Sequence, residues 1–143
     1  MDKINFYADT TKVGMPFIKI KEGDLEGSIF LLDTGSNNSL MFGYAYEQVK
    51  QRMHKIDGFK THWGIEGKPM QVSSVGGKLT FDGMDYDMSF LLLEDDIAGK
   101  MLSEELGFTI AGIIGTAFMS EHDWVIDFSK QEVQVRNSNV SVE

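Results

Sequence analysis

A carboxylate followed by hydroxyl residues and a glycine is the part of this chain best suited to chemistry. Residues 29–36 read Ile-Phe-Leu-Leu-Asp-Thr-Gly-Ser, so four apolar residues lead directly into Asp33. A buried strand that ends in a carboxylate places that group at the edge of the core, partly removed from water. Thr34 and Ser36 offer hydroxyl groups, and Gly35 lets another backbone or a substrate come close. The pattern suits acid–base chemistry at Asp33, although a strand followed by an ordinary Asp-Gly turn would look the same.

A second glycine-containing element lies near the other end of the chain. Residues 111–128 contain Gly-Ile-Ile-Gly, then an expected short helical turn, then an apolar strand that ends in Ile-Asp-Phe. With this element the chain resembles the retropepsin-like aspartic proteases. In that family an apolar-apolar-Asp-Thr-Gly-Ser loop is followed, near the chain end, by an apolar-apolar-Gly strand that packs beside it. The matching segments here are Leu31–Ser36 and Ile113–Gly115, and the resemblance covers residues 16–135.

The resemblance implies hydrolysis of peptide bonds by two carboxylates around one water. The ionised carboxylate takes a proton from the water, and the protonated one polarises the scissile carbonyl. Two carboxylates this close share a proton, as aspartic proteases illustrate. The chain holds one Asp-Thr-Gly sequence and no Asp-Ser-Gly, so an enzyme of this type must be a homodimer with Asp33 of each chain at the two-fold axis. The resemblance makes Asp33, Thr34 and Gly35 the catalytic loop, with Thr34 binding across that axis.

The resemblance also implies a peptide or protein substrate and no cofactor. Ser36 is the expected substrate contact beside the catalytic loop. A flap is expected at Trp63–Lys68, where Ile65, Glu66 and Gly67 would close over an extended peptide and pair with its backbone. In one respect the chain departs from the family. Relatives often carry an acidic residue two positions after the second glycine of the C-terminal element, and this chain has Ala117 there.

Composition narrows the class of protein further. The chain has 143 residues, with 13 Lys and Arg against 22 Asp and Glu, and therefore a net charge of −9. Such a chain repels phosphate groups, so we expect neither nucleic acid nor a membrane surface as a partner. It has no cysteine, which excludes disulfides and thiol catalysis. A cysteine-free chain without a signal-peptide pattern fits the cytoplasm, and export after removal of a leader stays open.

The hydrophobic pattern predicts a mainly β protein, a closed acid-protease-like β-barrel with one or two short helices, in one domain over residues 1–143. Helices are expected at Tyr44–His54 and at Ile97–Leu106, the second ending before Gly107, and a further helical turn is expected after Gly115. Turns are expected at 22–24 and 82–83, and strands at 13–21, 28–32, 59–65, 70–75, 79–81, 86–93, 110–114, 124–128 and 132–135.

Other polar residues are assigned structural roles. His54, His62 and His122 lack the spacing of metal ligands, so no metal site is expected. Glu94–Asp96 is interpreted as the solvated start of a helix, which the helix dipole stabilises. Asp127 matches a recurrent acidic position in the family, and we interpret it as a hydrogen-bonding group of a turn or of the core.

Two alternatives to an active protease stay open. The first is a catalytically inactive retropepsin-like module for dimerisation or peptide binding, because a fold does not fix a function. The second is an unrelated small β-barrel that binds an apolar ligand, with Asp33 as a turn residue. The oligomeric state separates the first alternative from the protease, because a monomer would leave Asp33 without its partner.

Overall fold

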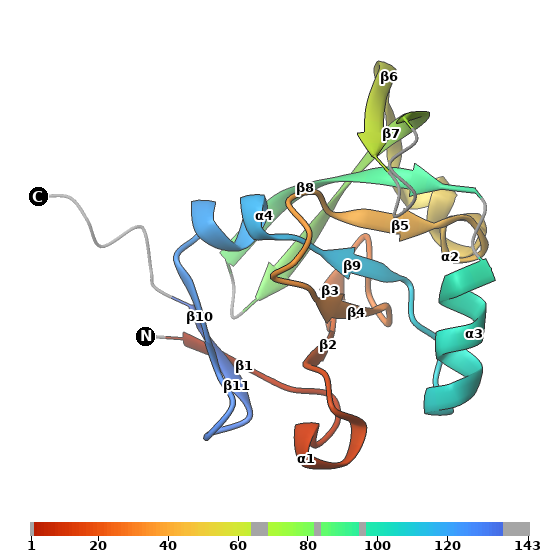
Figure 1. The fold of residues 1–143 in the computed structure, drawn as a ribbon. Coiled ribbons are helices and arrows are strands. Elements are labelled where there is room, and N and C mark those ends of the chain that lie inside the picture. Colours follow the sequence, from red (N-terminus) through yellow and green to blue (C-terminus); the bar gives the residue numbers. More distant parts are fainter. Residues whose placement is uncertain (1, 64–68, 82–83, 95–96, 136–143) are drawn as a thin grey trace, which may run out of the picture.

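The computed structural model describes residues 2–63, 69–81, 84–94 and 97–135. Strands dominate this part of the chain, and its helices are short (Figure 1). The helices are α1 (Thr10–Val13), α2 (Gly43–Val49), α3 (Ile97–Leu106) and α4 (Thr116–Glu121), with a 3-10 turn, η1 (Lys50–Arg52). The strands are β1 (Asp2–Asn5), β2 (Phe17–Lys19), β3 (Glu22–Gly23), β4 (Ile29–Leu32), β5 (Leu40–Phe42), β6 (His54–Trp63), β7 (Pro69–Phe81), β8 (Met84–Leu93), β9 (Gly112–Ile114), β10 (Trp124–Asp127) and β11 (Glu132–Val135).

The strands form two sheets. The smaller sheet has the order β1-β11-β10 and is antiparallel throughout. The larger sheet has the order β2-β4-β9-β5-β8-β7-β3, with β6 paired to β7. Two of its pairs, β4 with β9 and β5 with β8, are parallel. These parallel pairs bring together strands that are far apart in the sequence, so the two motif-bearing segments lie side by side.

Strand β9 lies between β4 and β5 at the centre of the larger sheet. Leu32 pairs with Ile114 on one side, and Leu40 pairs with Ile113 on the other. The strands come so close that a Cβ atom on Gly112 would lie 2.0 Å from the carbonyl oxygen of Leu40. A glycine is therefore required at the start of the Gly-Ile-Ile-Gly segment, because any side chain there would separate β9 from β5.

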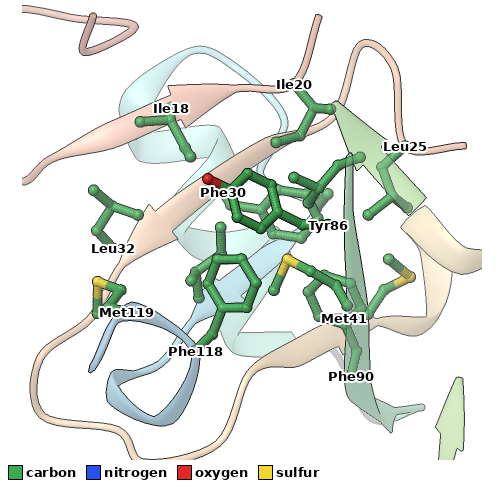
Figure 2. Close-up of a cluster of buried hydrophobic side chains, with 14 of the residues drawn as sticks. Ile18, Ile20, Leu25, Phe30, Leu32, Met41, Tyr86, Phe90, Phe118 and Met119 are labelled. Atoms are coloured by element: carbon green, nitrogen blue, oxygen red, sulfur yellow. The ribbon is translucent and has the colours of Figure 1, made fainter. Parts of the chain in front are cut away.

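The main hydrophobic core joins residues from both sheets and from α4 (Figure 2). The rings of Phe30 in β4 and Phe90 in β8 stack with their centroids 5.2 Å apart. Phe118 of α4 makes edge contacts with Tyr86 in the larger sheet and Trp124 in the smaller one. Burial of an aromatic side chain of this size stabilises a fold by roughly 1.5–3 kcal/mol. The strand that leads into Asp33 and the helix that follows Gly115 are thus fixed by the same core.

Several predicted elements are confirmed along with the mainly β class. Helix α3 covers the predicted Ile97–Leu106, and Gly107 follows it with a φ of +81° and an N–H group that donates to the Ser103 carbonyl. A left-handed glycine of this kind ends many helices. Helix α4 is the helical turn predicted after Gly115. Strands β7 and β8 form the predicted hairpin, whose turn residues 82–83 lie outside the described residues.

The predicted helix Tyr44–His54 is too long. Helix α2 ends at Val49, the chain tightens into η1, and His54 already belongs to β6. Pairing with β7 explains the difference, because His54 lies opposite Gly76 and its ring covers that glycine. A Cβ atom on Gly76 would lie 2.7 Å from the His54 Nε2 atom. A cross-strand contact of this kind outweighs the weak helix preference of a few residues.

The predicted turn at Glu22–Asp24 is also wrong. Glu22–Gly23 forms the short strand β3, which pairs with β7. The chain reverses instead at Leu25–Gly27, where Gly27 has a φ of +88° and its N–H group donates to the Ile20 carbonyl at 2.7 Å. The tertiary pairing with β7 therefore moves the turn three residues along the chain, a shift that local composition does not reveal.

The predicted strand 13–21 starts only at Phe17, because Thr10–Val13 forms the helix α1. Asp9 caps this helix by accepting hydrogen bonds from the N–H and hydroxyl groups of Thr11. These hydrogen bonds hold the pKa of Asp9 below its usual value. Strands β1 and β5 were not predicted, since each is too short to show an alternating pattern. No helix of the described chain is long and apolar enough to cross a membrane.

Candidate active site

Asp33 follows β4 directly and begins a loop, residues 33–39, that leads to β5. Its N–H group donates to the carbonyl of Ile114 at 3.0 Å, so the pairing of β4 with β9 continues one residue past the strand. The Oδ1 atom of its carboxylate accepts a hydrogen bond from the Gly35 N–H group at 2.9 Å. Asp33 is half-buried, and Thr34 and Gly35 are exposed. The carboxylate therefore sits at the edge of the core, as predicted, with one oxygen held by the backbone.

The start of α4 holds the middle of this loop. The Ser36 carbonyl accepts hydrogen bonds from the N–H group of Thr116 at 2.7 Å and from its hydroxyl at 3.2 Å. The Asn37 carbonyl accepts from the N–H group of Ala117 at 3.1 Å. The first N–H groups of a helix have no partner within the helix, so the loop carbonyls satisfy them. The loop and the helix thus fix one another, although residues of the two segments are some 80 positions apart.

Gly115 and Ser39 complete this arrangement. A Cβ atom on Gly115 would lie 2.4 Å from the carbonyl oxygen of Asn38, so the loop passes where a side chain would be. The Gly115 N–H group donates to the Ser39 hydroxyl at 3.0 Å, and the Ser39 carbonyl accepts from the Leu91 N–H group in β8. Ser39 is buried, with 9% of its surface exposed. We did not predict this role, and a lone serine before a short apolar run gives no signal that could have revealed it.

Ser36, the predicted substrate contact, uses its hydroxyl within the loop. The Oγ atom donates to the Asn38 carbonyl at 2.8 Å. The hydroxyl oxygen can still accept a hydrogen bond from a ligand. A substrate contact at Ser36 therefore stays a prediction, and the hydroxyl's own proton is already used to shape the loop.

The predicted flap residues Ile65, Glu66 and Gly67 lie outside the described residues. The strands on either side are described: β6 ends at Trp63, β7 begins at Pro69, and these two residues pair with each other. The pair β6–β7 carries a register shift between Ile56 and Phe59. A substrate role for the three flap residues stays a prediction.

Asp33 forms no ion pair within the described ranges. The salt bridges found there join Lys3 with Glu132, Lys50 with Glu47 and His122 with Glu121. In the same part of the chain, no three His, Asp or Glu side chains come together in a way that could hold a metal ion. His122 packs its ring against Tyr86 and Phe118, with centroids 4.6 and 4.5 Å apart. The polar environment of the Asp33 carboxylate is thus set by backbone groups of its own loop.

Asp127 has the structural role predicted for it. Its Oδ1 atom accepts a hydrogen bond from the Lys130 N–H group at 3.0 Å, across the turn between β10 and β11. Its Oδ2 atom accepts from the Gln134 side-chain amide at 3.2 Å. The predicted helix-start acids Asp95 and Asp96 lie outside the described residues, and α3 begins at Ile97.

Comparison with known proteins identifies structures that have a similar fold. No protein-family model matches the chain, and no curated protein matches it in sequence. Among solved structures, the chain is similar to EIAV protease in complex with the inhibitor HBY-793, with a TM-score of 0.53 and 17% identity over 75% of this chain and 86% of that one. It is also similar to the retroviral protease-like domain of Ddi1 from Leishmania major, with a TM-score of 0.52 and 14% identity over 96% of this chain and 97% of that one.

The first of these structures is a protease and the second is a retroviral protease-like domain, which matches the chain over nearly its whole length. At these identities the likeness establishes the fold alone. Strand β9 pairs directly with β4, as the resemblance predicted for the two motif-bearing segments. This chain therefore has the retropepsin-like fold.

Proposed function

We propose that this protein is a homodimeric aspartic endopeptidase. The observation that carries the proposal is the state of the Asp33 carboxylate. It is half-buried, and its Oδ1 atom is held by the Gly35 N–H group at 2.9 Å. No hydrogen bond within the described residues occupies its Oδ2 atom. A carboxylate that is fixed in place and has an oxygen left to bind water meets the geometric requirement for a general base.

Dimerisation supplies the second carboxylate. Asp33 is the only acidic residue of loop 33–39, so one chain brings one carboxylate to this site. In a symmetric dimer the same patch of each chain meets itself, and two copies of Asp33 can then share one proton around one water. The exposed Thr34 beside Asp33 is the residue that would bind the partner loop across the axis.

A peptide would lie across the paired loops. The exposed Gly35 backbone and the Ser36 hydroxyl oxygen would face the substrate, and Ile65, Glu66 and Gly67 would cover it from the end of the β6–β7 pair. An extended peptide forms main-chain hydrogen bonds with such strands, and side-chain pockets add specificity. One retropepsin-like domain spanning residues 1–143 carries the whole active half-site in this proposal.

Cleavage of a diverse peptide mixture at acidic and neutral pH tests the proposal, with products identified by mass spectrometry. We expect cleavage by the wild type and none by Asp33→Asn. Asp123→Asn is the matched control, because it makes the same change at an exposed aspartate with a left-handed φ of 54°, which asparagine also adopts. Cleavage by the Asp33→Asn variant at the wild-type rate would rule out the proposed chemistry.

The mass of the protein in solution tests the second half of the proposal. Light scattering of the wild type at high protein concentration should give the mass of two chains, about twice the 16.1 kDa of one. A mass of one chain under conditions where the wild type is inactive would favour the peptide-binding module instead. A mass of one chain under conditions where it cleaves would contradict the shared pair of Asp33 carboxylates.

A further inference from the structure

A cleft of about 220 Å³ lies beside the loop that carries Asp33. Its walls include Asn38 from the loop, Asp87 and Ser89 from β8, and Ala117 and Glu121 from α4. All five residues are exposed to solvent. The side chain of Ala117 is only a methyl group, so α4 does not fill the cleft beside the loop 33–39.

A buried hydroxyl without a partner lines the cleft. Ser74 of β7 is 2% exposed, and its Oγ atom has no hydrogen-bond partner among the described residues. Ser39, the neighbouring buried serine of the same cleft, has its hydroxyl bonded to the Gly115 N–H group. A buried polar atom without a partner costs free energy of folding. Ser74 thus offers a ligand in this cleft a hydrogen-bonding group that the folded chain itself does not use.

The charge of the cleft indicates which ligand it suits. Asp87 and Glu121 bring two carboxylates to its walls. Lys78 lies opposite Asp87 in the β7–β8 register, yet no ion pair joins these two described residues. The contact of Glu121 is with the His122 Nε2 atom, at 3.8 Å. Two carboxylates that form no ion pair with a Lys or Arg of the described residues, in a chain of net charge −9, favour a positively charged ligand.

Among cationic groups, a guanidinium fits this set of acceptors best. It carries five N–H donors in a planar fork and no acceptor. It can bond one carboxylate with two parallel hydrogen bonds and still reach a hydroxyl such as that of Ser74. An ammonium group has three donors around one nitrogen, so it lacks the planar fork that gives a carboxylate two parallel hydrogen bonds. The side-chain carbonyls of Asn37 and Asn38 provide further acceptors at the rim.

The position of the cleft connects it to the active site. Asn37 and Asn38 line it, and they follow Asp33 by four and five residues in the same short loop. An extended peptide advances about 3.3 Å per residue, so a peptide held at Asp33 reaches this rim within a few residues. We propose that the cleft binds an arginine side chain of the peptide substrate, a few residues from the bond that is cut. This inference rests on the proposed protease function, because only a protease would bind the arginine peptide as a substrate.

A binding experiment tests the cleft without requiring catalysis. The full-length Asp33→Asn variant, labelled with ¹⁵N, is titrated with the peptide acetyl-Ala-Ala-Arg-Ala-Ala-amide and with its twin in which citrulline replaces arginine. Citrulline has the shape of arginine without its charge. We expect saturable shifts of the Ser74 and Ser89 amide signals with the arginine peptide and about tenfold weaker binding of the citrulline peptide. Equal binding of both peptides, or no saturable shift at these residues, would overturn the inference.

Variants of the cleft residues distinguish binding at the cleft from general electrostatic attraction of a cationic peptide to an acidic protein. Added to the Asp33→Asn chain, the pair Asp87→Asn and Glu121→Gln should weaken binding of the arginine peptide about tenfold. The pair Glu104→Gln and Glu105→Gln removes the same charge from exposed positions on α3 and should change affinity less than twofold. Ser74→Ala should weaken binding about threefold with no fall in the thermal midpoint. An equal effect of both charge pairs would contradict a site at this cleft.

Cleavage by the wild type decides whether the bound arginine belongs to a substrate. Products of a peptide mixture should show arginine enriched at one fixed distance from the cut bond, and the Asp87→Asn and Glu121→Gln pair should lose that enrichment. Cleavage with no preference for arginine would overturn this inference and leave the proposed protease function intact. Absence of cleavage beside specific arginine-peptide binding would do the reverse, because the site would stand and the protease function would fall.

Discussion

Two aspartates of this chain follow apolar strands in nearly the same way, and their surroundings differ. Asp33 ends the run Ile-Phe-Leu-Leu-Asp after β4, and Asp127 ends Trp-Val-Ile-Asp in β10. Both oxygens of the Asp127 carboxylate accept hydrogen bonds, one from Lys130 and one from Gln134. One oxygen of the Asp33 carboxylate is held by Gly35, and the other has no partner in the described residues.

This difference separates a structural carboxylate from one that is available for chemistry. A carboxylate whose two oxygens both accept hydrogen bonds within the protein fixes a turn, and a water would have to share those oxygens with the existing donors. The Oδ2 atom of Asp33 is not shared in this way within the described residues, because the surrounding loop is held by other groups. Thr116, Ala117 and Gly115 donate to loop carbonyls or to Ser39, so the loop keeps its shape without using the second oxygen of Asp33.

The largest expected effect comes from exchanging each of these aspartates for asparagine. Asp33→Asn should lower kcat/KM for peptide cleavage by at least about a thousandfold, because general acid–base groups contribute about 10²–10⁴ and both halves of the pair are lost. Its free energy of unfolding should change by less than about 0.5 kcal/mol. Asp127→Asn should keep kcat/KM within about twofold. A similar loss of activity in both variants would remove the distinction between the two carboxylates.

The next largest effect concerns the glycine against which the loop packs. Gly115→Ala places a Cβ atom 2.4 Å from the Asn38 carbonyl oxygen, a backbone atom that cannot move without the loop. We expect a loss of about 2–4 kcal/mol in the free energy of unfolding, measured by urea denaturation. Gly77→Ala is the matched control, because its Cβ atom would meet the flexible Met53 side chain at 3.3 Å and the Cβ atom of Asp24 at an ordinary 3.6 Å, with no backbone atom among these contacts. A cost for Gly115→Ala no larger than for Gly77→Ala would show that the loop is not fixed by this contact.

Much of this arrangement could be predicted from the sequence, because the relevant signals are local. A pattern of a few residues predicts each of four features: the apolar run before Asp33, the Gly-Ile-Ile-Gly segment, α3 and the β10–β11 hairpin. The loop geometry could be anticipated only through the resemblance. Side chains that act across long sequence distances gave no local sign. Ser39 and Gly115 are 76 positions apart, and nothing in either segment indicates their hydrogen bond.

The incorrect predictions have the same origin. His54 and Glu22–Gly23 were assigned to a helix and a turn from their neighbours in sequence, and both belong to strands that pair with β7. The unpaired hydroxyl of Ser74 likewise depends on segments far apart in the sequence, namely the loop 33–39, β7, β8 and α4, which meet around one cleft. Local propensity describes which conformations a segment favours, and pairing with a distant strand decides among them.

A moderate loss of stability is expected when the buried Ser39, whose hydroxyl accepts a hydrogen bond, is replaced by alanine. Ser39→Ala removes the acceptor of the Gly115 N–H group, which then stays buried without a partner. This should cost about 1–3 kcal/mol of unfolding free energy, since the desolvation of the N–H group is no longer offset. Hydrogen–deuterium exchange should also report faster exchange at Gly115. An unchanged midpoint and unchanged exchange would contradict the role given to Ser39 in holding the loop.

The smallest effect, and the one of opposite sign, is expected at the other buried serine of the cleft. Ser74→Ala removes a hydroxyl that has no partner in the described chain, at a position 2% exposed. No hydrogen bond is lost, and a buried polar atom is replaced by a hydrogen. The free energy of unfolding should therefore stay the same or rise by up to about 1 kcal/mol, measured without peptide. A fall of more than about 1 kcal/mol would mean that the Ser74 hydroxyl already has a partner in the folded protein. A partner of that kind would remove the reason for treating this cleft as built for a ligand, whereas a stable Ser74→Ala protein that binds the arginine peptide poorly would tie the unused hydroxyl to recognition.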